Sequence, residues 1–436
     1  MTKPTVALLT QGCKVNQYES EAIAEAFERA GFALCPPDAV CDVYVINSCT
    51  VTAESDRKAG QLIRRVHAQN ERAVILVTGC FSQATPAAVA AIAGVDDVCG
   101  NTDKLSVVTA ARAILEKGKP AAPAIRVGDV RTAPFEPMTI TRFERTRAYV
   151  KIEDGCENRC AYCAIPGARG RVRSKPLDDV VKEVEGLTRG GCREVVLTGI
   201  ETASWGRDLE GVGLADLLEA VDGIEGIGRV RLGSLDPSLM KQDFVDRIAK
   251  LKSLTPHFHI SMQSGSSAVL AGMRRKYNRD MAMTGIERLR AAFPRLELTT
   301  DFIVGFPGES DADFADTLSF AKAADFLQMH VFAYSPREGT PAASMKGQPD
   351  EATKKTRSAT LIAHGEALKQ KRLEKALEHP LQTVLFETYE NGRAIGHTDA
   401  FYTVSMESDT PLHGELLPVR LTKTENGVLY AERRNG

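Results

Sequence analysis

Strand-like and helix-like segments alternate along most of this chain of 436 residues, and that alternation is the strongest constraint on its fold. Strands that alternate with helices form parallel sheets covered by those helices. The first third is predicted to hold three such units, with strands at 5–10, 43–47 and 73–78 and helices at 18–30, 53–69 and 86–92. We therefore expect an α/β fold whose sites lie outside the carboxyl ends of the strands.

A cysteine follows each of these three strands, and the three are 36 and then 31 residues apart. One isolated cysteine is most often a buried, inert thiol. Repetition at the same strand end instead predicts that the three converge on one edge of a small domain and bind a metal cluster. They are Cys13, Cys49 and Cys80. Four others share neither this position nor a ligand spacing, and we expect ordinary buried thiols at Cys35, Cys41, Cys99 and Cys192.

A second group of cysteines, Cys156, Cys160 and Cys163, has the spacing CxxxCxxC. Zinc sites and redox dithiols favour CxxC, and a zinc site also needs a fourth ligand that this loop does not offer. The spacing fits better an iron–sulfur cluster that three thiolates hold and that leaves one iron open.

The βα alternation continues around and after this loop, with predicted strands at 148–152, 194–197, 230–233, 257–262, 296–303 and 327–332. A closed parallel barrel needs eight such units and more chain. Six units predict an incomplete barrel with an open side that admits a large substrate. Polar residues recur at the strand ends and are candidates for binding a nucleoside-like cofactor, at 198–201, 234–236, 263–265 and 305–309.

Two further segments differ from this pattern. Residues 118–141 are rich in Pro, Gly and Ala without a sustained period, which is typical of a linker. After a charged helix at 349–378, the last sixty residues show short alternating strands with Asn-Gly turns, which predicts a small antiparallel barrel.

Charge gives a mixed indication about nucleic acid. The net charge of −2 argues against a protein that coats nucleic acid nonspecifically, and residues 381–436 hold five Lys or Arg against eight Asp or Glu. Residues 142–175, however, hold nine Lys or Arg against four Asp or Glu. We therefore expect an anionic partner near the CxxxCxxC loop, with phosphate contacts from Arg169, Arg171 and Arg173.

The composition, 43% hydrophobic and 26% charged, is that of a globular protein with real cores. The chain has neither a run of 18 apolar residues nor the apolar start of a signal peptide. We expect a cytoplasmic protein without membrane contact, in which thiols stay reduced.

Several motifs together resemble the radical S-adenosylmethionine methylthiotransferases over nearly the whole chain. They are Gly12-Cys13-Lys14-Val15-Asn16-Gln17-Tyr18-Glu19, Asn47-Ser48-Cys49-Thr50, Thr78-Gly79-Cys80, the CxxxCxxC loop with Ile165-Pro166-Gly167, Gln263-Ser264-Gly265, residues 301–308 and Tyr334-Ser335-Pro336. The run after Cys13 is most similar to the branch that acts on threonylcarbamoyladenosine in tRNA.

The resemblance implies two [4Fe-4S] clusters, one on each cysteine triad, and S-adenosylmethionine as both methyl donor and radical source. The reaction implied is insertion of sulfur and a methyl group at C2 of the adenosine at tRNA position 37, with no side chain acting as a catalytic group. It also implies contacts with S-adenosylmethionine from Tyr162, Gly199, Glu201, Ser234, Asp236 and Ile303. Arg275 either reaches the cofactor carboxylate or caps a helix.

The domains implied are a methylthiotransferase N-terminal domain at 2–117, a linker at 118–141, a radical core at 142–372 and an RNA-binding TRAM-like barrel at 375–436. The expected partners are the tRNA anticodon loop, an electron donor and a sulfur source. Three alternatives stay open: isopentenyladenosine in tRNA as the substrate, a ribosomal protein as the substrate, or a non-enzymatic iron–sulfur redox sensor that binds RNA.

Overall fold

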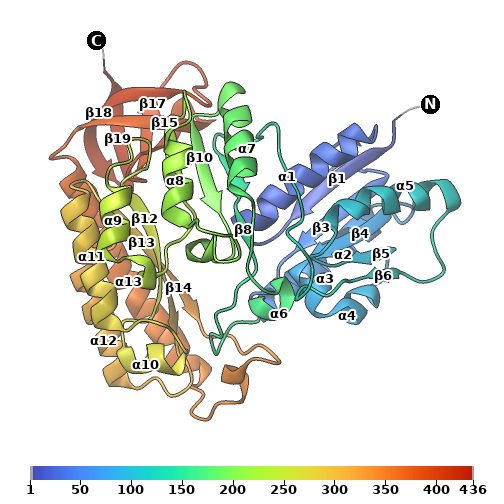
Figure 1. The fold of residues 1–436 in the computed structure, drawn as a ribbon, viewed down its shortest axis with the longest axis horizontal. Coiled ribbons are helices and arrows are strands. Elements are labelled where there is room, and N and C mark those ends of the chain that lie inside the picture. The colour runs from blue at the N-terminus through green and yellow to red at the C-terminus, as the bar shows by residue number, and fades with distance from the viewer. Residues whose placement is uncertain (1–2, 435–436) are drawn as a thin grey trace.

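The computed structural model describes residues 3–434 and has three parts (Figure 1). An N-terminal α/β domain packs against a larger α/β core, and a small β-barrel caps the core at one end. None of the helices within residues 3–434 combines the length and apolar character needed to cross a membrane.

The N-terminal domain is built on one parallel sheet with the order β2-β1-β3-β4-β5-β6. Its strands are β1 (Thr5–Thr10), β2 (Ala33–Leu34), β3 (Val43–Ser48), β4 (Val74–Gly79), β5 (Asp97–Cys99) and β6 (Ala124–Arg126). Its helices are α1 (Lys14–Arg29), α2 (Ala53–Gln69), α3 (Cys80–Ala84), α4 (Pro86–Ala90) and α5 (Val107–Lys117). The central strands β3 and β4 are buried along their whole length, which explains why their sequences are apolar without alternation.

The segment 118–141 is not the free linker that its composition suggested. Its residues 124–126 form β6, which pairs with β5 at the edge of the sheet. Further along, Met138 and Ile140 are buried in the same core cluster as Tyr18 of α1. This segment therefore packs along the junction between the N-terminal domain and the core.

The core contains two three-stranded parallel sheets, with the orders β11-β10-β7 and β12-β13-β14. Isolated bridges from Val230 to Leu254 and from Leu235 to Ile260 connect them into one open arc. The six strands are β7 (Ala148–Lys151), β10 (Glu194–Thr198), β11 (Arg229–Leu232), β12 (His257–Gln263), β13 (Glu297–Val304) and β14 (Gln328–Ala333). The prediction of an incomplete six-stranded barrel is confirmed.

Helices follow the core strands and cover the outside of the arc (Figure 1). They are α7 (Leu177–Arg189), α8 (Leu214–Asp222), α9 (Gln242–Ile248), α10 (Ser267–Gly272), α11 (Arg279–Ala292), α12 (Asp311–Ala324) and α13 (Glu351–Ala376). The short helix α6 (Ile165–Arg169) instead lies beside α3 of the N-terminal domain (Figure 1). A short antiparallel pair, β8 (Glu153–Asp154) with β9 (Arg173–Ser174), joins the two ends of the segment that holds the CxxxCxxC loop.

The C-terminal part is a small closed barrel of five strands, as predicted, and most of its strand pairs are antiparallel. They are β15 (Leu381–Glu390), β16 (Arg393–Thr398), β17 (Thr403–Glu407), β18 (Leu416–Glu425) and β19 (Val428–Arg433). One pair, β17 with β19, is parallel.

This barrel docks on the amino ends of the core strands. Arg229, the first residue of β11, donates to the carbonyl of Thr383 at 2.7 Å. His257, the first residue of β12, stacks on Phe401 with 4.6 Å between ring centroids. The barrel therefore lies at the end of the core opposite to the carboxyl ends of the strands (Figure 1).

Candidate functional site

The CxxxCxxC loop lies between β8 and α6 and is held by backbone hydrogen bonds from both sides. The amide of Cys156 donates to the carbonyl of Gly170 at 3.0 Å, and the amide of Ala161 donates to the carbonyl of Met273 at 3.0 Å. Gly155 has a φ of +92°, and a Cβ there would lie 1.8 Å from the carbonyl oxygen of Arg171. Only glycine allows the chain to enter the loop so close to another backbone segment.

The three cysteines of this loop open onto one cavity of about 330 Å³ at the carboxyl ends of the core strands. Burial raises the pKa of Cys156 to about 12 and that of Cys163 to about 11. Without a bound metal the thiols are therefore neutral at pH 7, and a metal that binds thiolates displaces their protons.

The second triad comes from three neighbouring strands. Cys13 follows β1, Cys49 follows β3 and Cys80 begins α3 after β4. A Cβ on Gly12, which has a φ of +115°, would lie 3.3 Å from the sulfur of Cys49. Cys49 and Cys80 are buried, whereas Cys13 is exposed, although desolvation by the surrounding protein raises its pKa. The structure thus brings these three side chains to one edge of the sheet.

Within residues 3–434, no three His, Cys, Asp or Glu side chains are close enough together to hold a single metal ion. A cluster of several irons has a different requirement, because each thiolate binds a different iron and the sulfurs must stand farther apart. Neither triad forms a mononuclear site in the described part of the chain.

The two triads face the same region of the molecule. Val51 and Thr52, which follow Cys49, line the 330 Å³ cavity together with Cys156, Cys160 and Cys163. Arg337 of the core fixes this loop by donating to Thr50 Oγ1 at 2.8 Å and by pairing with Asp56 at 2.6 Å.

A buried group of charges, which we call the interface ion cluster, lies between the N-terminal domain and the core. Arg169, the last residue of α6, donates from Nε to the sulfur of Cys80 at 3.1 Å. Its Nη1 forms ion pairs with Glu19 of α1 and Asp154 of β8. The ion pairs of the cluster join six residues: Glu19, Lys104, Lys151, Asp154, Arg169 and Arg173.

The prediction that Arg169 and Arg173 contact RNA phosphates is therefore wrong. Both side chains are buried, at 0% and 2% relative exposure, and both are used in the interface ion cluster. The prediction was based on the excess of basic residues in this segment. A guanidinium enclosed by carboxylates and backbone, however, does not reach an external phosphate. Arg171, between them, is exposed.

Three of the six residues expected to contact S-adenosylmethionine line the cavity: Tyr162, Glu201 and Ile303. The other three lie outside its lining. Gly199 packs against Glu153, where a Cβ would come within 2.7 Å of Oε2. The carbonyl of Ser234 accepts a hydrogen bond from Thr202. Asp236 pairs with Arg275 at 2.7 Å in a smaller hollow beside the cavity.

Glu201 lies in the cavity wall and has a raised pKa. Burial raises its pKa to about 7, and the neighbouring Asp236 acts in the same direction. The side-chain amide of Asn158 donates to Glu201 Oε2 at 3.0 Å. A group poised between its neutral and charged forms suits binding of a cationic ligand group, which would favour the carboxylate.

The sequence left two roles open for Arg275, a contact with the cofactor carboxylate or a helix cap, and the structure gives it two partners at the site. Nη1 donates to the sulfur of Cys160 at 3.1 Å and Nη2 to Asp236 at 2.7 Å. Phe332 was not singled out either. It is 49% exposed and lines the cavity, and in the β13–β14 register it is the partner of Ile303. No sequence pattern indicated the contact of Arg275 with Cys160 or the place of Phe332 in the cavity wall.

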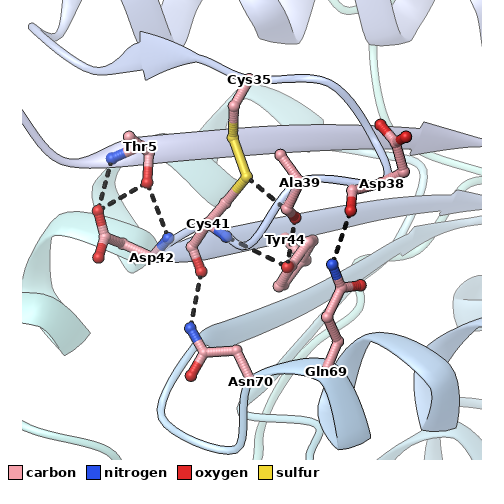
Figure 2. Close-up of a disulfide and its surroundings, with 9 residues drawn as sticks. All are labelled: Thr5, Cys35, Asp38, Ala39, Cys41, Asp42, Tyr44, Gln69 and Asn70. Atoms are coloured by element: carbon pink, nitrogen blue, oxygen red, sulfur yellow. Dashed lines mark hydrogen bonds between the residues drawn. A yellow bond between two sulfur atoms is a disulfide. The ribbon is translucent and has the colours of Figure 1, made fainter.

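Two cysteines expected to be ordinary buried thiols form a disulfide instead. Cys35 follows β2 and Cys41 precedes β3, and the short turn between them brings their sulfurs together (Figure 2). Hydrogen bonds hold this turn, including one from the Asn70 side chain to the carbonyl of Cys41 at 3.0 Å. Cys99 and Cys192 are free and buried, as expected.

Comparison with known proteins places both halves of the site in described families. Residues 150–321 match the radical SAM superfamily, and residues 5–100 match the uncharacterized protein family UPF0004. The threonylcarbamoyladenosine tRNA methylthiotransferase MtaB of Bacillus subtilis is 38% identical over 434 residues, which are 98% of this chain and 95% of that protein. The chain belongs to the radical S-adenosylmethionine methylthiotransferases.

Other methylthiotransferases of this family differ in substrate. The MtaB protein of Thermotoga maritima is 38% identical over 98% of this chain and 96% of its own length. A tRNA-2-methylthio-N(6)-dimethylallyladenosine synthase of Moorella thermoacetica is 34% identical over 100% of this chain and 99% of its own length. Among solved structures, the radical S-adenosylmethionine methyltransferase TsrM of Kitasatospora setae shares the fold, with a TM-score of 0.58 at 16% identity over 78% of this chain and 77% of its own.

The cofactors of this methylthiotransferase family are [4Fe-4S] clusters and S-adenosylmethionine, and the chain is a transferase. The residues present fit both. The ion pairs of the interface ion cluster contain four cations and only two carboxylates, and Arg169 directs its remaining N–H to Cys80. Buried positive charge in excess is costly unless an anion, such as a thiolate-ligated cluster, balances it. At the cavity, Asn158 Oδ1 and Tyr334 Oη have no hydrogen-bond partner among the described residues, which suits a polar ligand.

Proposed function

We propose that this methylthiotransferase acts on threonylcarbamoyladenosine at position 37 of tRNA and places a methylthio group on adenine C2. The observation that carries the proposal is that the CxxxCxxC triad opens onto a cavity also lined by Val51 and Thr52, which follow Cys49 of the second triad. In addition, the chain matches MtaB proteins over nearly its full length. A radical source and a sulfur carrier must reach the same carbon atom, and the position of the second triad's loop in the wall of this cavity supports that arrangement.

We assign Cys156, Cys160 and Cys163 to the cluster that binds S-adenosylmethionine, and Cys13, Cys49 and Cys80 to the second cluster. When bound, the first cluster and S-adenosylmethionine supply the radical that removes hydrogen from adenine C2, and the second supplies sulfur. The protein itself binds and orients the cofactor and the substrate, and it excludes water from the site. In this assignment Tyr162 and Ile303 hold the adenine side of the cofactor and Glu201 receives its ammonium group, while Asp236 acts through Arg275.

The substrate assignment is tested by nucleoside mass spectrometry of tRNA from a strain that lacks the gene. The 2-methylthio form of threonylcarbamoyladenosine should disappear and unmodified threonylcarbamoyladenosine should accumulate, and the gene on a plasmid should restore the wild-type pattern. Loss of the methylthio group from isopentenyladenosine instead would assign the chain to the branch of the Moorella thermoacetica relative.

The RNA contact is proposed at the cavity mouth. Phe332 lies on β14, an edge strand of the open arc, and exposes an aromatic ring beside Ile303. Single-stranded RNA is bound by stacking of unpaired bases on exposed aromatic rings. We assign Phe332 as the platform for a loop base, with Arg171 as a candidate phosphate contact.

Phe332→Ala should weaken binding of an anticodon stem-loop RNA by roughly 1–3 kcal/mol, the value of one stacked base. Fluorescence anisotropy with the cluster-loaded protein measures this, and Phe332→Tyr should retain most of the affinity. Ile362→Ala is the matched control, because Ile362 is 48% exposed but belongs to α13 and does not line the cavity. Equal losses in the two alanine variants would remove Phe332 from the RNA site.

The reaction also needs an electron donor and a sulfur source, and we propose that the protein works with both in the cytoplasm, where tRNA is modified. The terminal barrel would bind the body of the tRNA, and its place on the amino ends of the core strands leaves the cavity mouth free for the anticodon loop.

A further inference from the structure

Two buried arginines each donate a hydrogen bond to one cysteine sulfur, and each sulfur belongs to a different triad. Arg169 Nε lies 3.1 Å from the sulfur of Cys80, and Arg275 Nη1 lies 3.1 Å from the sulfur of Cys160. Both guanidinium groups are enclosed, with 0% and 6% side-chain exposure. The mechanism assigned above does not use either contact.

The guanidinium of Arg169 cannot turn away from Cys80, because its other donors are occupied. Nη2 donates to Asn16 Oδ1 at 2.6 Å and to Glu19 Oε2 at 3.1 Å, and Nη1 is shared between Glu19 and Asp154. Nε is thus the donor left for the sulfur. The contact crosses the junction between domains, because Arg169 belongs to the core and Cys80 to the N-terminal domain.

Arg275 is fixed in the same manner on the other side of the cavity. Its Nη2 pairs with Asp236 at 2.7 Å and its Nε donates to the hydroxyl of Tyr277 at 3.0 Å. The hydroxyl of Tyr277 in turn donates to the backbone carbonyls of Ser261 and Met262. The direction of Nη1 toward Cys160 is therefore set by the surrounding structure.

We propose that Arg169 and Arg275 are positioning residues that set the reduction potentials of the two clusters separately, each through its N–H···S hydrogen bond. This inference rests on the proposed cluster ligands. Reduction adds negative charge to a cluster and its thiolates, so a cationic donor at the sulfur stabilises the reduced form more than the oxidised form. Loss of either donor should make reduction of its own cluster less favourable and leave the other unchanged.

The experiment is an anaerobic redox titration followed by electron paramagnetic resonance on proteins that hold one cluster each. Replacing Cys156, Cys160 and Cys163 with alanine leaves the triad beside Arg169, and replacing Cys13, Cys49 and Cys80 leaves the triad beside Arg275. In the first protein, Arg169→Gln should reduce the equilibrium constant for one-electron reduction about tenfold, a shift of about 59 mV to lower potential. In the second, Arg275→Gln should do the same.

Matched controls separate the hydrogen bond from the charge. Arg173→Gln removes one cation from the same ion cluster, but Arg173 donates to the carbonyl of Arg169 and pairs with Asp154 without touching a sulfur. Arg207→Gln removes one cation near Arg275, because Arg207 lines the same hollow as Asp236 and Arg275. Both should shift the potentials clearly less than the two test variants. Where Arg169→Gln does not fold, Arg169→Lys keeps the charge and should still lower the potential.

Each arginine variant is also placed in the other single-cluster protein, where it should leave the potential unchanged. The proposal is overturned if Arg169→Gln and Arg173→Gln shift the potential equally, if neither test variant shifts its own cluster, or if each shifts the other cluster as much as its own. Failure to bind iron at a retained triad would also overturn it. Of these results, only this one would also show that the proposed cluster ligands are wrong. An unchanged potential in a protein with full iron content would leave the proposed function standing.

Discussion

The Cys80→Ala variant should continue to cleave S-adenosylmethionine and should fail to methylthiolate tRNA. Cys80 belongs to the triad on the N-terminal sheet, whereas the cavity that would hold S-adenosylmethionine is lined by Cys156, Cys160 and Cys163. Removing one ligand of the proposed sulfur-supplying cluster leaves the radical-generating cluster intact. Chromatography of 5′-deoxyadenosine and mass spectrometry of the nucleosides measure the two activities in one reaction.

The matched variants make this result specific. Cys160→Ala should lose both activities, because Cys160 belongs to the loop that opens onto the cavity. Cys99→Ala should keep both, because Cys99 is a buried thiol on the neighbouring strand β5 that bonds to the carbonyl of Asp103. Methylthiolated tRNA from Cys80→Ala would mean that the second cluster is held elsewhere.

The second large effect is expected on stability, at the centre of the interface ion cluster. Glu19 is fully buried and accepts hydrogen bonds from Lys104, Lys151 and Arg169. Burial alone would raise its pKa, but the three cations hold the pKa of Glu19 well below its usual range. The carboxylate is therefore charged at neutral pH, and its stabilising effect is lost progressively as the pH falls from 4.5 towards the depressed pKa of the folded state.

Glu19→Gln should destabilise the protein by about 3–5 kcal/mol, because it leaves buried cations without their main counter-charge. Denaturant unfolding at pH 7 measures the loss. Glu54→Gln is the control: Glu54 pairs with Arg57 on the exposed face of α2, and its removal should leave the unfolding midpoint unchanged. A Glu19 variant as stable as the Glu54 variant would show that the ion cluster does not support the domain junction.

Much of the fold could be predicted because the strands are buried and apolar. The predicted strands at 194–197, 257–262 and 296–303 differ by only one residue at either end from β10, β12 and β13. The positions of Cys13, Cys49 and Cys80 after parallel strands could also be predicted, whereas the disulfide between Cys35 and Cys41 could not. Periodicity and spacing are local properties, and sequence reports them well.

What sequence could not predict depends on contacts between distant segments. Residues 124–126 become a strand only because β5 offers an unpaired edge, and nothing in their own composition indicates it. Arg169 pairs with Glu19, which lies 150 residues away in the sequence. Because the sequence does not show this partner, the basic side chain was expected at the surface, whereas the structure buries it. The same holds for Arg275 and Cys160, which are 115 residues apart.

Purified, cluster-loaded protein with S-adenosylmethionine, dithionite and a sulfide source tests the central claim most directly. Two anticodon stem-loop RNAs of one sequence, carrying threonylcarbamoyladenosine or isopentenyladenosine at position 37, compete at equal concentration, and mass spectrometry of the nucleosides identifies the product. The methylthio group should appear on threonylcarbamoyladenosine. Its appearance on isopentenyladenosine, or on neither nucleoside while S-adenosylmethionine is cleaved, would contradict the proposed function.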